Sequence, residues 1–198
     1  LGGKPLYLHV LDTALASKTI DEVYLDTESE EVANLAGDRA FKRIVRPVEL
    51  ANNATDGNKL LLFEASQIPQ AEIYVQILPT APFLTKETIN KAIYELIKNP
   101  SLQSVTTVLK QKQYLWSENG KPLNYDLKKI PNSVDLAPTI IETMGFYAIK
   151  KNELFSTKSR LGNAPTLFEI PLLESFDINT EEEFSIAEAI FNGRSKNE

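Results

Sequence analysis

Hydrophobic residues recur along this chain with two periods, one typical of helices and one typical of strands. Apolar positions spaced three and four residues apart predict helices over residues 5–17, 29–36, 56–66 and 86–98. Short apolar runs between these helices predict strands over residues 20–25, 41–45 and 72–78. Strands that alternate with helices favour an α/β fold in which parallel strands are joined by right-handed crossovers.

The second half of the chain has a different pattern. It predicts a short helix centred on Leu154 and strands over residues 104–110, 145–149 and 167–170. Between the first two of these strands, Asn119 and Gly120 suit a tight hairpin turn, because this pair tolerates the positive φ values that such turns require. We expect residues 111–140 to form a hairpin extension that contacts a neighbouring subunit.

Composition narrows the class of protein. With 198 residues, of which 42% are hydrophobic, the chain is expected to form one domain, residues 1–198. Its net charge of −6 without a basic run argues against nucleic acid or an anionic membrane as the main partner. No apolar run is long enough to span a membrane and no signal peptide opens the sequence, so we expect a soluble cytoplasmic protein.

The residue types also exclude some chemistry. The chain has no cysteine, which rules out disulfides, thiolate zinc sites and cysteine nucleophiles. Its only histidine is His9, so a Ser-His-Asp triad would have to use that residue. Because His9 lies within the helical pattern of residues 5–17, we expect it to have a structural role.

An acidic stretch near the end of the chain, SFDINTEEEF at residues 175–184, permits two interpretations, a metal site or the start of a helix. Thr180 and Glu183 form a capping box. Glu181 and Glu182 lie in the first helical turn, where negative charge interacts favourably with the helix dipole. These acids are therefore explained by the start of a helix.

Asp177 has no such explanation. If the chain is extended here, Ser175, Asp177 and Asn179 lie on one face, while Phe176 and Ile178 point into the core. Oxygen ligands at alternate positions suit Mg²⁺, which takes one or two protein oxygens and completes its coordination with water and phosphate. A magnesium site at Asp177 is the alternative interpretation of the stretch.

Three predicted strands are each followed by a short loop. Each loop permits two interpretations, a structural role and a role in binding a ligand. The DTES segment at residues 26–29 caps the next helix. Arg46 would ordinarily be a surface charge, but at the end of a strand its planar guanidinium can hold a phosphate. The LPTAP segment at residues 78–82 is a proline-rigid turn in which Thr80 can face a cleft. Because ligands of α/β sheets gather at the carboxyl ends of strands, three such loops predict a site.

Six short motifs follow one another along the chain. They are GGKPL at residues 2–6, DTESEEVA at 26–33, RPVEL at 46–50, LPTAP at 78–82, SRLG at 159–162 and SFDIN at 175–179. Each motif is weak alone, but in this order they cover nearly the whole chain. Together they resemble the acylneuraminate cytidylyltransferase family, the CMP-sialic acid synthetases and their relatives.

The resemblance implies a three-layer nucleotide-diphospho-sugar transferase fold, which is Rossmann-like, with a mixed sheet and a protruding dimerisation hairpin. It implies a homodimer that binds CTP and an acidic sugar. The anomeric hydroxyl of the sugar would attack the α-phosphate of CTP, giving a CMP-sugar and pyrophosphate. Mg²⁺ would be the cofactor, because it neutralises charge on the triphosphate and on the leaving pyrophosphate.

The resemblance also assigns roles to residues of this chain. Asp177 and Arg46 would be catalytic, Asp177 as a ligand of Mg²⁺ with Asn179 beside it, and Arg46 as a contact to phosphate. Residues on the nucleotide side would be Asp26, Thr27, Arg46 and Pro47. Residues on the acceptor side would be Leu78, Thr80, Tyr147 and Arg160.

The acceptor side departs from the family pattern. The family resembles QPTSPLR where this chain has LPTAPFL, so Leu78 and Leu84 replace a glutamine and an arginine. It resembles RENGSIY where this chain has IETMGFY, so Ile141 and Thr143 replace a basic and an amide residue. A pocket that loses such donors should reject N-acetylneuraminate, so we expect another acidic sugar or a related acid as the acceptor.

Two further departures concern the phosphates and the metal. The family has a first strand and a glycine-rich basic loop, resembling ARGGSK, just before the position of GGKPL. Leu1 follows that position, and we expect the missing segment to precede it. Asn179 stands where the family usually has a second aspartate, which keeps an oxygen ligand but removes a charge.

Two alternative functions stay open. The first is a non-catalytic dimeric homologue that binds nucleotide or sugar, suggested by Asn179, by Leu78 and by the missing phosphate loop. The second is a nucleotidyltransferase that uses UTP or GTP. The motifs RPVEL and SFDIN favour CTP instead, because they resemble the cytidylyl branch.

Overall fold

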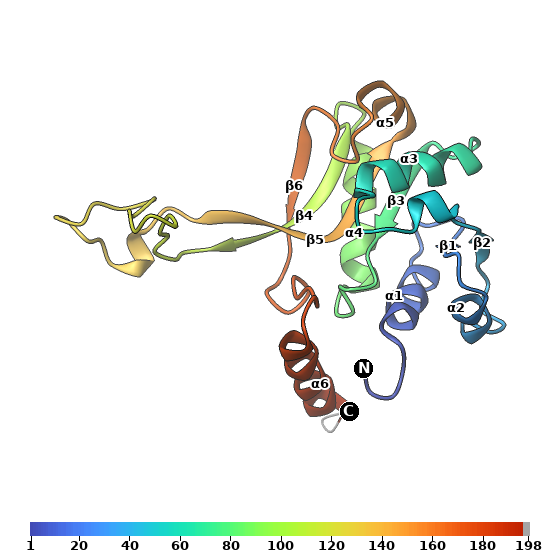
Figure 1. Cartoon of the computed structure of the whole chain (residues 1–198). Coiled ribbons are helices and arrows are strands. Elements are labelled where there is room, and N and C mark those ends of the chain that lie inside the picture. Colours follow the sequence, from blue (N-terminus) through green and yellow to red (C-terminus); the bar gives the residue numbers. More distant parts are fainter. Residues whose placement is uncertain (196–198) are drawn as a thin grey trace.

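A computed structural model describes residues 1–195 as an α/β protein (Figure 1). Its main sheet has four strands in the order β3(Ile73–Ile77), β5(Thr139–Lys150), β4(Ser104–Gln111) and β6(Pro165–Glu169). β5 runs antiparallel to both of its neighbours, whereas β4 and β6 are parallel. A separate parallel pair consists of β1(Tyr24–Asp26) and β2(Lys42–Ile44). The expected mixed sheet is therefore confirmed.

The expectation of parallel strands from the hydrophobic pattern is wrong for β5. The chain leaves β4 through an extension and returns directly as β5 without a crossover helix, and a direct return makes neighbouring strands antiparallel. β3 and β4 are instead separated by the helix α4(Lys86–Lys98), and both run against β5. Hydrophobic periodicity does not report strand direction, so the sequence pattern could not distinguish these cases.

Helices account for the remaining regular structure. They are α1(Leu6–Leu15), α2(Glu30–Leu35), α3(Gly57–Gln67), α4, α5(Lys151–Thr157) and α6(Glu181–Ser195), with short 3-10 turns η1(Val48–Leu50) and η2(Ser133–Asp135). The four helices predicted in the first half agree with α1 to α4 within two residues at each end. The strand predicted over residues 145–149 is longer than expected, because β5 begins at Thr139.

Alternate residues of the main sheet pack against helices on opposite faces. On one face, Phe146 and Ala148 of β5 join Ile93 and other buried residues of α4 in one core cluster. On the other face, Ile149 of β5 packs with Leu61 of α3 and with α5. The expected three layers, helix, sheet and helix, are present, and burial on both faces fixes which side chains remain at the ends of the strands.

The segment of residues 111–140, which we call the arm, projects from the body of the protein (Figure 1). Leu123 N donates to Leu115 O at 2.8 Å, and Gly120 adopts a φ of +74° at the predicted turn. The ring of Tyr125 lies edge-on to Tyr114 and Trp116, with centroids 5.0 and 5.8 Å away. The arm is therefore a hairpin-like projection with an aromatic cluster, and its contact with a second subunit stays a prediction.

The helix start predicted at Thr180 is confirmed. Glu183 N donates to Thr180 Oγ1 at 3.2 Å, and Thr180 N donates to Glu183 Oε2 at 2.9 Å. The N–H of Asn179, together with the contacts to Thr180, lowers the pKa of the Glu183 carboxyl. Glu181 and Glu182 lie in the first turn of α6, so three of the four acids in this stretch belong to the helix start.

His9 has the structural role that was expected for it. Its Nε2 lies 2.9 Å from Leu1 O, and its ring packs edge-on against Phe191 with centroids 5.3 Å apart. Burial lowers the pKa of the imidazole, which favours the neutral form. These contacts join the start of the chain to α1 and α6.

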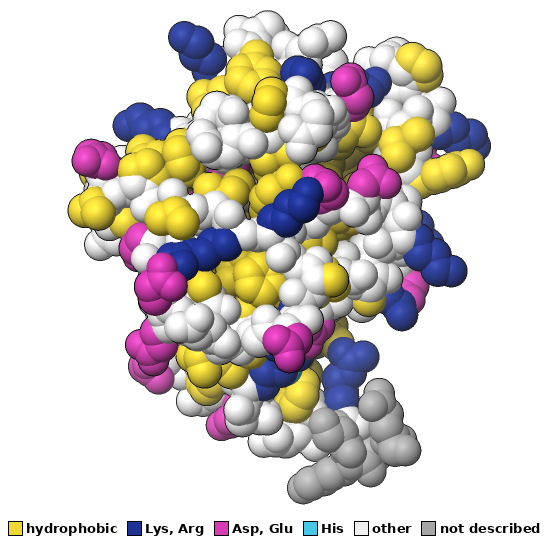
Figure 2. All heavy atoms as spheres, turned by 90° about the vertical axis from the view of Figure 1, so that its right-hand side faces the viewer, with side chains coloured by type: hydrophobic (Ala, Val, Ile, Leu, Met, Phe, Trp, Pro, Cys, Tyr) yellow, Lys and Arg dark blue, Asp and Glu magenta, His cyan; other side chains and the backbone are white. Residues whose placement is uncertain are grey.

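Helix length and surface charge bear on which partners the protein can bind. Within residues 1–195, no helix is both long enough and apolar enough to cross a membrane. On the face drawn in Figure 2, Lys and Arg side chains are interspersed with Asp and Glu side chains. This face therefore has no large area of a single charge sign.

We predict that Thr85→Ala destabilises the protein by about 1 to 2 kcal/mol. Thr85 caps α4 by accepting a hydrogen bond from Thr88 N at 3.2 Å, and its N and Oγ1 donate to Glu174 Oε2 at 3.0 and 2.9 Å. Urea unfolding should show a lower midpoint with an unchanged slope. Thr85→Ser, which keeps the hydroxyl, is the control, and equal stability of the alanine and wild-type proteins would contradict the role of the cap.

Candidate functional site

The loops that follow β1 and β2 meet at an ion pair. Arg46 Nε donates to Asp26 Oδ2 at 2.9 Å, and Arg46 Nη2 donates to the Asp26 carbonyl at 3.3 Å. Side-chain exposure is 9% for Asp26 and 25% for Arg46, so the pair is largely shielded from water. The structure thus brings together two of the residues predicted for the nucleotide side.

Asp26 also faces a second carboxyl group that the sequence interpretation missed. Glu64 of α3 lies beside it, and burial, followed by the contact with Asp26, raises the pKa of Glu64 to about 8, with Arg46 acting in the opposite direction. Asp26 Oδ1 is buried and has no hydrogen-bond donor among the described residues. A proton on Glu64 would provide that donor.

Gln76 of β3 connects this acid pair to the acceptor side. Its Nε2 donates to Glu64 Oε2 at 3.3 Å, and its Oε1 accepts from Arg160 Nη1 at 3.2 Å. These two contacts fix the orientation of the amide. Gln76 is thus the junction between the predicted nucleotide and acceptor residues.

Arg160 and Tyr147 form the next part of the network. Arg160 Nη2 donates to the Tyr147 hydroxyl at 2.9 Å, and its guanidinium carbon lies 3.7 Å from the centre of the Tyr147 ring. The hydroxyl in turn donates to Glu142 Oε1. Burial, and then the hydrogen bond to Glu142, raises the pKa of Tyr147, so the phenol stays protonated. Two residues predicted for the acceptor side are therefore in direct contact.

The first turn of α3 provides a close-fitting seat for Arg160. Arg160 N donates to Asn58 Oδ1 at 2.9 Å. A Cβ placed on Gly57 would lie 2.2 Å from Arg160 Nη1, closer than real Cβ contacts allow. The guanidinium can therefore occupy this position because residue 57 has no side chain.

Asp177 and Asn179 lie together beside the loop after β3. Asn179 Nδ2 donates to Asp177 Oδ2 at 2.7 Å, and Ile178 N donates to the Thr80 carbonyl at 2.9 Å. Ile178 is buried and Phe176 is partly buried, both in one apolar cluster, which agrees with the alternation predicted for an extended segment. The two predicted metal ligands are thus neighbours, and the backbone beside them contacts the predicted acceptor residue Thr80.

The donor set at Asp177 fits Mg²⁺. Asp177 Oδ1 is buried and has no hydrogen-bond partner among the described residues, which is the state expected of a carboxylate oxygen that awaits a cation. Within residues 1–195 no three histidine or acidic side chains form a metal cage. A cation here would therefore take most of its ligands from water and phosphate, as Mg²⁺ does.

Other predicted site residues occupy supporting positions. The hydroxyl of Thr27 is buried and accepts from Ser29 N at 3.1 Å, which braces the loop after β1. Pro47 is partly buried and precedes η1. Leu78 is partly buried, and its N donates to Gly145 O at 3.0 Å. Whether these residues contact a ligand stays a prediction.

Two of the departures from the family pattern have structural explanations. Leu84 is 4% exposed and belongs to the core beneath α4, and Thr143 is 6% exposed. Thr143 Oγ1 lies 2.6 Å from Thr107 Oγ1. Neither side chain is accessible to an acceptor, whereas Ile141 is 40% exposed.

The loop after β3 packs against a bulge in β5, the strand that also carries Tyr147. The pairing with β4 shifts between Thr106 and Val108, opposite the segment of β5 that contains Met144 and Gly145. Met144 has a φ of +59°, which is uncommon for a residue with a side chain. A Cβ on Gly145 would lie 2.7 Å from Ala81 Cβ, so the loop packs directly on the strand.

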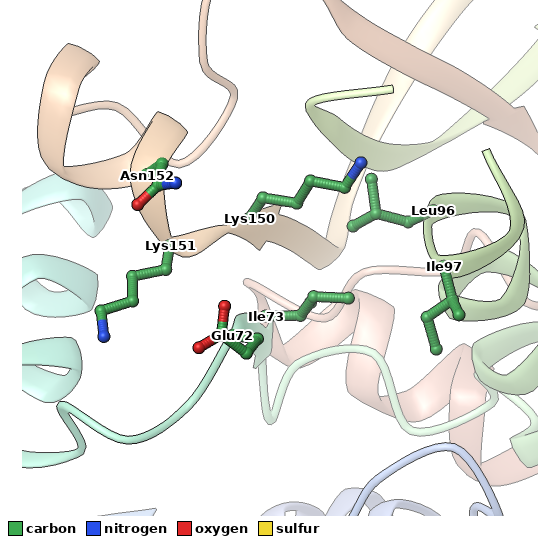
Figure 3. A pocket seen from close by; sticks show the side chains of 7 residues that line it. All are labelled: Glu72, Ile73, Leu96, Ile97, Lys150, Lys151 and Asn152. Atoms are coloured by element: carbon green, nitrogen blue, oxygen red, sulfur yellow. The ribbon is translucent and has the colours of Figure 1, made fainter. Parts of the chain in front are cut away.

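A hollow drawn in Figure 3 lies away from this network. It is lined at the amino end of β3 and at the end of β5 by Glu72, Ile73, Leu96, Ile97, Lys150, Lys151 and Asn152. Its two lysines already donate to backbone carbonyls, Lys150 Nζ to Pro100 O at 2.9 Å and Lys151 Nζ to Pro69 O at 2.6 Å. The polar network from Arg46 to Glu142 is therefore the better candidate for the site.

The sequence contains signals for some of the residues that were missed. Glu64 lies three residues after Leu61 and one before Ala65, both buried, so it is an acid on the apolar stripe of its helix. Gln76 likewise interrupts an apolar strand. A polar residue at an inward-facing position needs a partner, which makes both residues recognisable as members of a buried network.

Comparison with known proteins places the chain in a family. A family model described as Cytidylyltransferase matches residues 1–161. The chain is 26% identical over 195 residues to N-acylneuraminate cytidylyltransferase A of Danio rerio, covering 95% of this chain but 45% of that protein. It is 26% identical over 187 residues to 3-deoxy-manno-octulosonate cytidylyltransferase of Chlamydia felis (strain Fe/C-56), covering 87% of this chain and 72% of that protein.

Solved structures agree in fold. The structure of CMP:2-keto-3-deoxy-manno-octonic acid synthetase complexed with CTP has a TM-score of 0.69 at 16% identity, covering 97% of this chain and 89% of that chain. The 4-diphosphocytidyl-2C-methyl-D-erythritol synthase from Anaerococcus prevotii DSM 20548 also has a TM-score of 0.69, at 18% identity, covering 97% of this chain and 88% of that chain. The fold is thus that of nucleotidyltransferases. The family model matches well over half of the chain, including every residue of the polar network, so the chain belongs to the cytidylyltransferase family.

Proposed function

We propose that this protein transfers the cytidylyl group of CTP to a hydroxyl of an acidic sugar, giving a CMP-sugar and pyrophosphate. The observation that carries the proposal is the set of polar contacts from Arg46 to Glu142, in which Glu64 lies beside Asp26, in a chain of the cytidylyltransferase family. The names of both relatives specify sugar acids, which supports an acidic acceptor.

Arg46 is suited to binding the phosphates. Its pair with Asp26 uses Nε and one N–H of Nη2, so further N–H groups of the guanidinium stay available. Because the pair is largely shielded from water, its interaction with a triphosphate would be stronger than at an open surface. Arg46 therefore orients the nucleotide and offsets charge on its phosphates.

Arg160 is suited to holding the acceptor, and the completely buried Tyr147 supports it from below. The stacking of the guanidinium on the ring and its bonds to Gln76 and Tyr147 leave N–H groups for a carboxylate. Leu78, two residues after Gln76, is partly buried and offers no hydrogen bond from its side chain, which favours an acceptor other than N-acetylneuraminate. Holding the acceptor hydroxyl in line with the α-phosphate is then the main contribution of this side to the rate.

Asp177, with Asn179 beside it, would hold Mg²⁺, which supplies charge neutralisation for the triphosphate and the departing pyrophosphate. In the transfer, the acceptor oxygen forms a bond to the α-phosphorus as the bond to pyrophosphate breaks. No covalent intermediate with the protein is needed, because positioning and electrostatic stabilisation account for catalysis of phosphoryl-type transfers.

A non-catalytic homologue is the second candidate function. The described residues offer one carboxylate at the proposed metal position, because residue 179 is an asparagine. Such a protein would bind CTP or a sugar acid without releasing pyrophosphate.

We propose that the nucleotide is CTP and not UTP or GTP. Competition among the four nucleoside triphosphates for binding would decide this.

We predict that, in the presence of Mg²⁺, the protein releases pyrophosphate from CTP when it is given at least one member of a panel of 2-keto sugar acids. Asp177→Asn should lower kcat/KM at least about 100-fold, because it removes the charge that binds the cation. Glu182→Gln, which removes an exposed acid at the start of α6, is the matched control and should retain full activity.

The outcomes separate the two candidate functions. CTP binding without pyrophosphate release from any acceptor would support the non-catalytic homologue. Absence of both CTP binding and turnover in the wild-type protein would contradict both. Equal loss of activity in Asp177→Asn and Glu182→Gln would contradict the role assigned to Asp177.

We predict that Gly57→Ala raises the KM for the acceptor about tenfold or more. This is the loss of affinity expected when one hydrogen bond to a charged group is removed. The new methyl group would displace the Arg160 guanidinium from its seat. Stability should not fall, since alanine favours a helix more than glycine does. The control is Gly193→Ala in α6, where a Cβ meets nothing within 4 Å, and an unchanged acceptor KM in Gly57→Ala would refute this seat.

We propose that the arm binds a second copy of the chain. Its large apolar side chains include Trp116, Leu123, Leu127, Ile130 and Val134, each between 52% and 69% exposed. A soluble monomer seldom exposes so many on one projection. The arm carries four lysines and three acids in a chain of net charge −6, so the acidic body of a second copy is the complementary surface.

We predict that the protein is a dimer in solution and that Leu123→Glu combined with Leu127→Glu makes it monomeric. Two buried charges would be left without partners in the interface. Light scattering coupled to size-exclusion chromatography measures the mass directly. Ile97→Glu, which changes an exposed apolar residue of α4, is the control and should stay dimeric, while a monomeric wild-type protein would overturn the proposal.

A further inference from the structure

Glu64 occupies a position that the proposed reaction does not explain. It lies on the inward stripe of α3, between Asp26 of β1 and Gln76 of β3. The side chain of Glu64 is partly exposed, but protein atoms surround its carboxyl group. Burial is therefore the largest cause of its raised pKa. An acid in such a place requires a partner or a proton.

The hydrogen bonds around Glu64 leave one gap. Gln76 Oε1 accepts from Arg160, so the Gln76 amide group points its N–H toward Glu64 Oε2. On the other side, Arg46 Nε bonds Asp26 Oδ2, while Asp26 Oδ1 is buried without a donor. A hydrogen on the Glu64 carboxyl completes the set, because it can be shared with Asp26.

The charges that face Glu64 agree with a neutral carboxyl. Asp26 faces it from β1, Arg46 from the loop after β2, and the neutral Gln76 from β3. Its neighbours one turn away on α3 are uncharged, namely Leu60, Leu61, Gln67 and Ile68. One guanidinium thus faces two carboxyl groups, and it already pairs with Asp26.

We propose that Glu64 is a positioning residue of the nucleotide site, which in its protonated form donates a hydrogen bond to Asp26 and so keeps the Asp26–Arg46 pair oriented toward the triphosphate. This inference rests on the proposed function. An ionised Glu64 would repel Asp26, and it would also add a negative charge beside the place where the phosphates bind. Nucleotide affinity should therefore fall when Glu64 loses its proton.

The first test is the pH dependence of CTP binding to the full chain, measured by calorimetry between pH 6.5 and 9.5, a range around the raised pKa of about 8. In the wild-type protein Kd should rise with pH above that value, approaching about tenfold per unit if the ionised form binds poorly. Glu64→Gln should remove this rise, since an amide donates to Asp26 and cannot ionise. Glu64→Leu should bind more weakly at every pH.

A control separates Glu64 from other groups that titrate in this range. Glu72→Gln changes an exposed acid at the far end of β3 and should keep the wild-type profile. A Glu64→Gln protein with the same alkaline rise in Kd as the wild type would overturn the proposal. A merely structural role for Glu64 would lower affinity in its variants without changing the shape of the profile.

The second test does not depend on nucleotide binding. The folded pKa of Glu64 is above its ordinary value of 4.5, so its contribution to stability is complete below pH 4.5 and is lost as pH rises toward about 8. In urea unfolding, this decline should be smaller in Glu64→Gln than in the wild type. In Asp26→Asn, which removes the facing charge, the decline should end at a lower pH and be smaller in total.

The two tests distinguish failure of this inference from failure of the proposed function. If the wild-type protein binds no CTP at any pH, the proposed function and the nucleotide role of Glu64 fail together. The stability profile then decides whether the proton is shared. If CTP binds but both profiles are unchanged by Glu64→Gln, the proposed function stands and the inference about Glu64 is wrong.

Discussion

The register in which β3 pairs with β5 determines where the polar groups of the site lie. Gln76 is opposite Tyr147, and Ile77 is opposite Phe146, which is completely buried beneath α4. A slip of β3 by one residue would turn its side chains to the opposite faces of the sheet and place Gln76 in the apolar core beneath α4. Burial of apolar side chains on both faces therefore fixes the chemistry indirectly, because it allows one register only.

The sequence predicted the helices more accurately than the sheet. The stripe of α4 and the capping box at Thr180 are local features, and each was found where expected. β5 was predicted too short, and the hydrophobic pattern wrongly favoured a parallel direction for it. Its first residues are exposed at the base of the arm and Met144 interrupts the alternation with a positive φ, so the local pattern was lost there.

The site was predicted in parts. The resemblance directed attention to Asp26, Arg46 and Asp177, which lie at strand ends or loops that a colinear motif can locate; their roles stay predictions. It did not indicate Glu64, which lies in none of the six motifs. The sequence marks Glu64 only by its place on the apolar stripe of its helix, and the carboxyl group that it faces comes from a distant strand. Leu84 shows the converse, since a replaced residue that looked functional is buried in the core.

The continuity of β5 links the arm to the acceptor side. The strand leaves the arm at Thr139 and carries both Glu142 and Tyr147 before it ends at Lys150 (Figure 1). A force applied to the arm is thus transmitted along covalent backbone to the residues that hold Arg160. Met144, which has a positive φ within the bulge, lies on this strand between the arm and Tyr147. If the arm binds a second copy of the chain, as proposed, that contact would be coupled through this one strand to the position of Arg160.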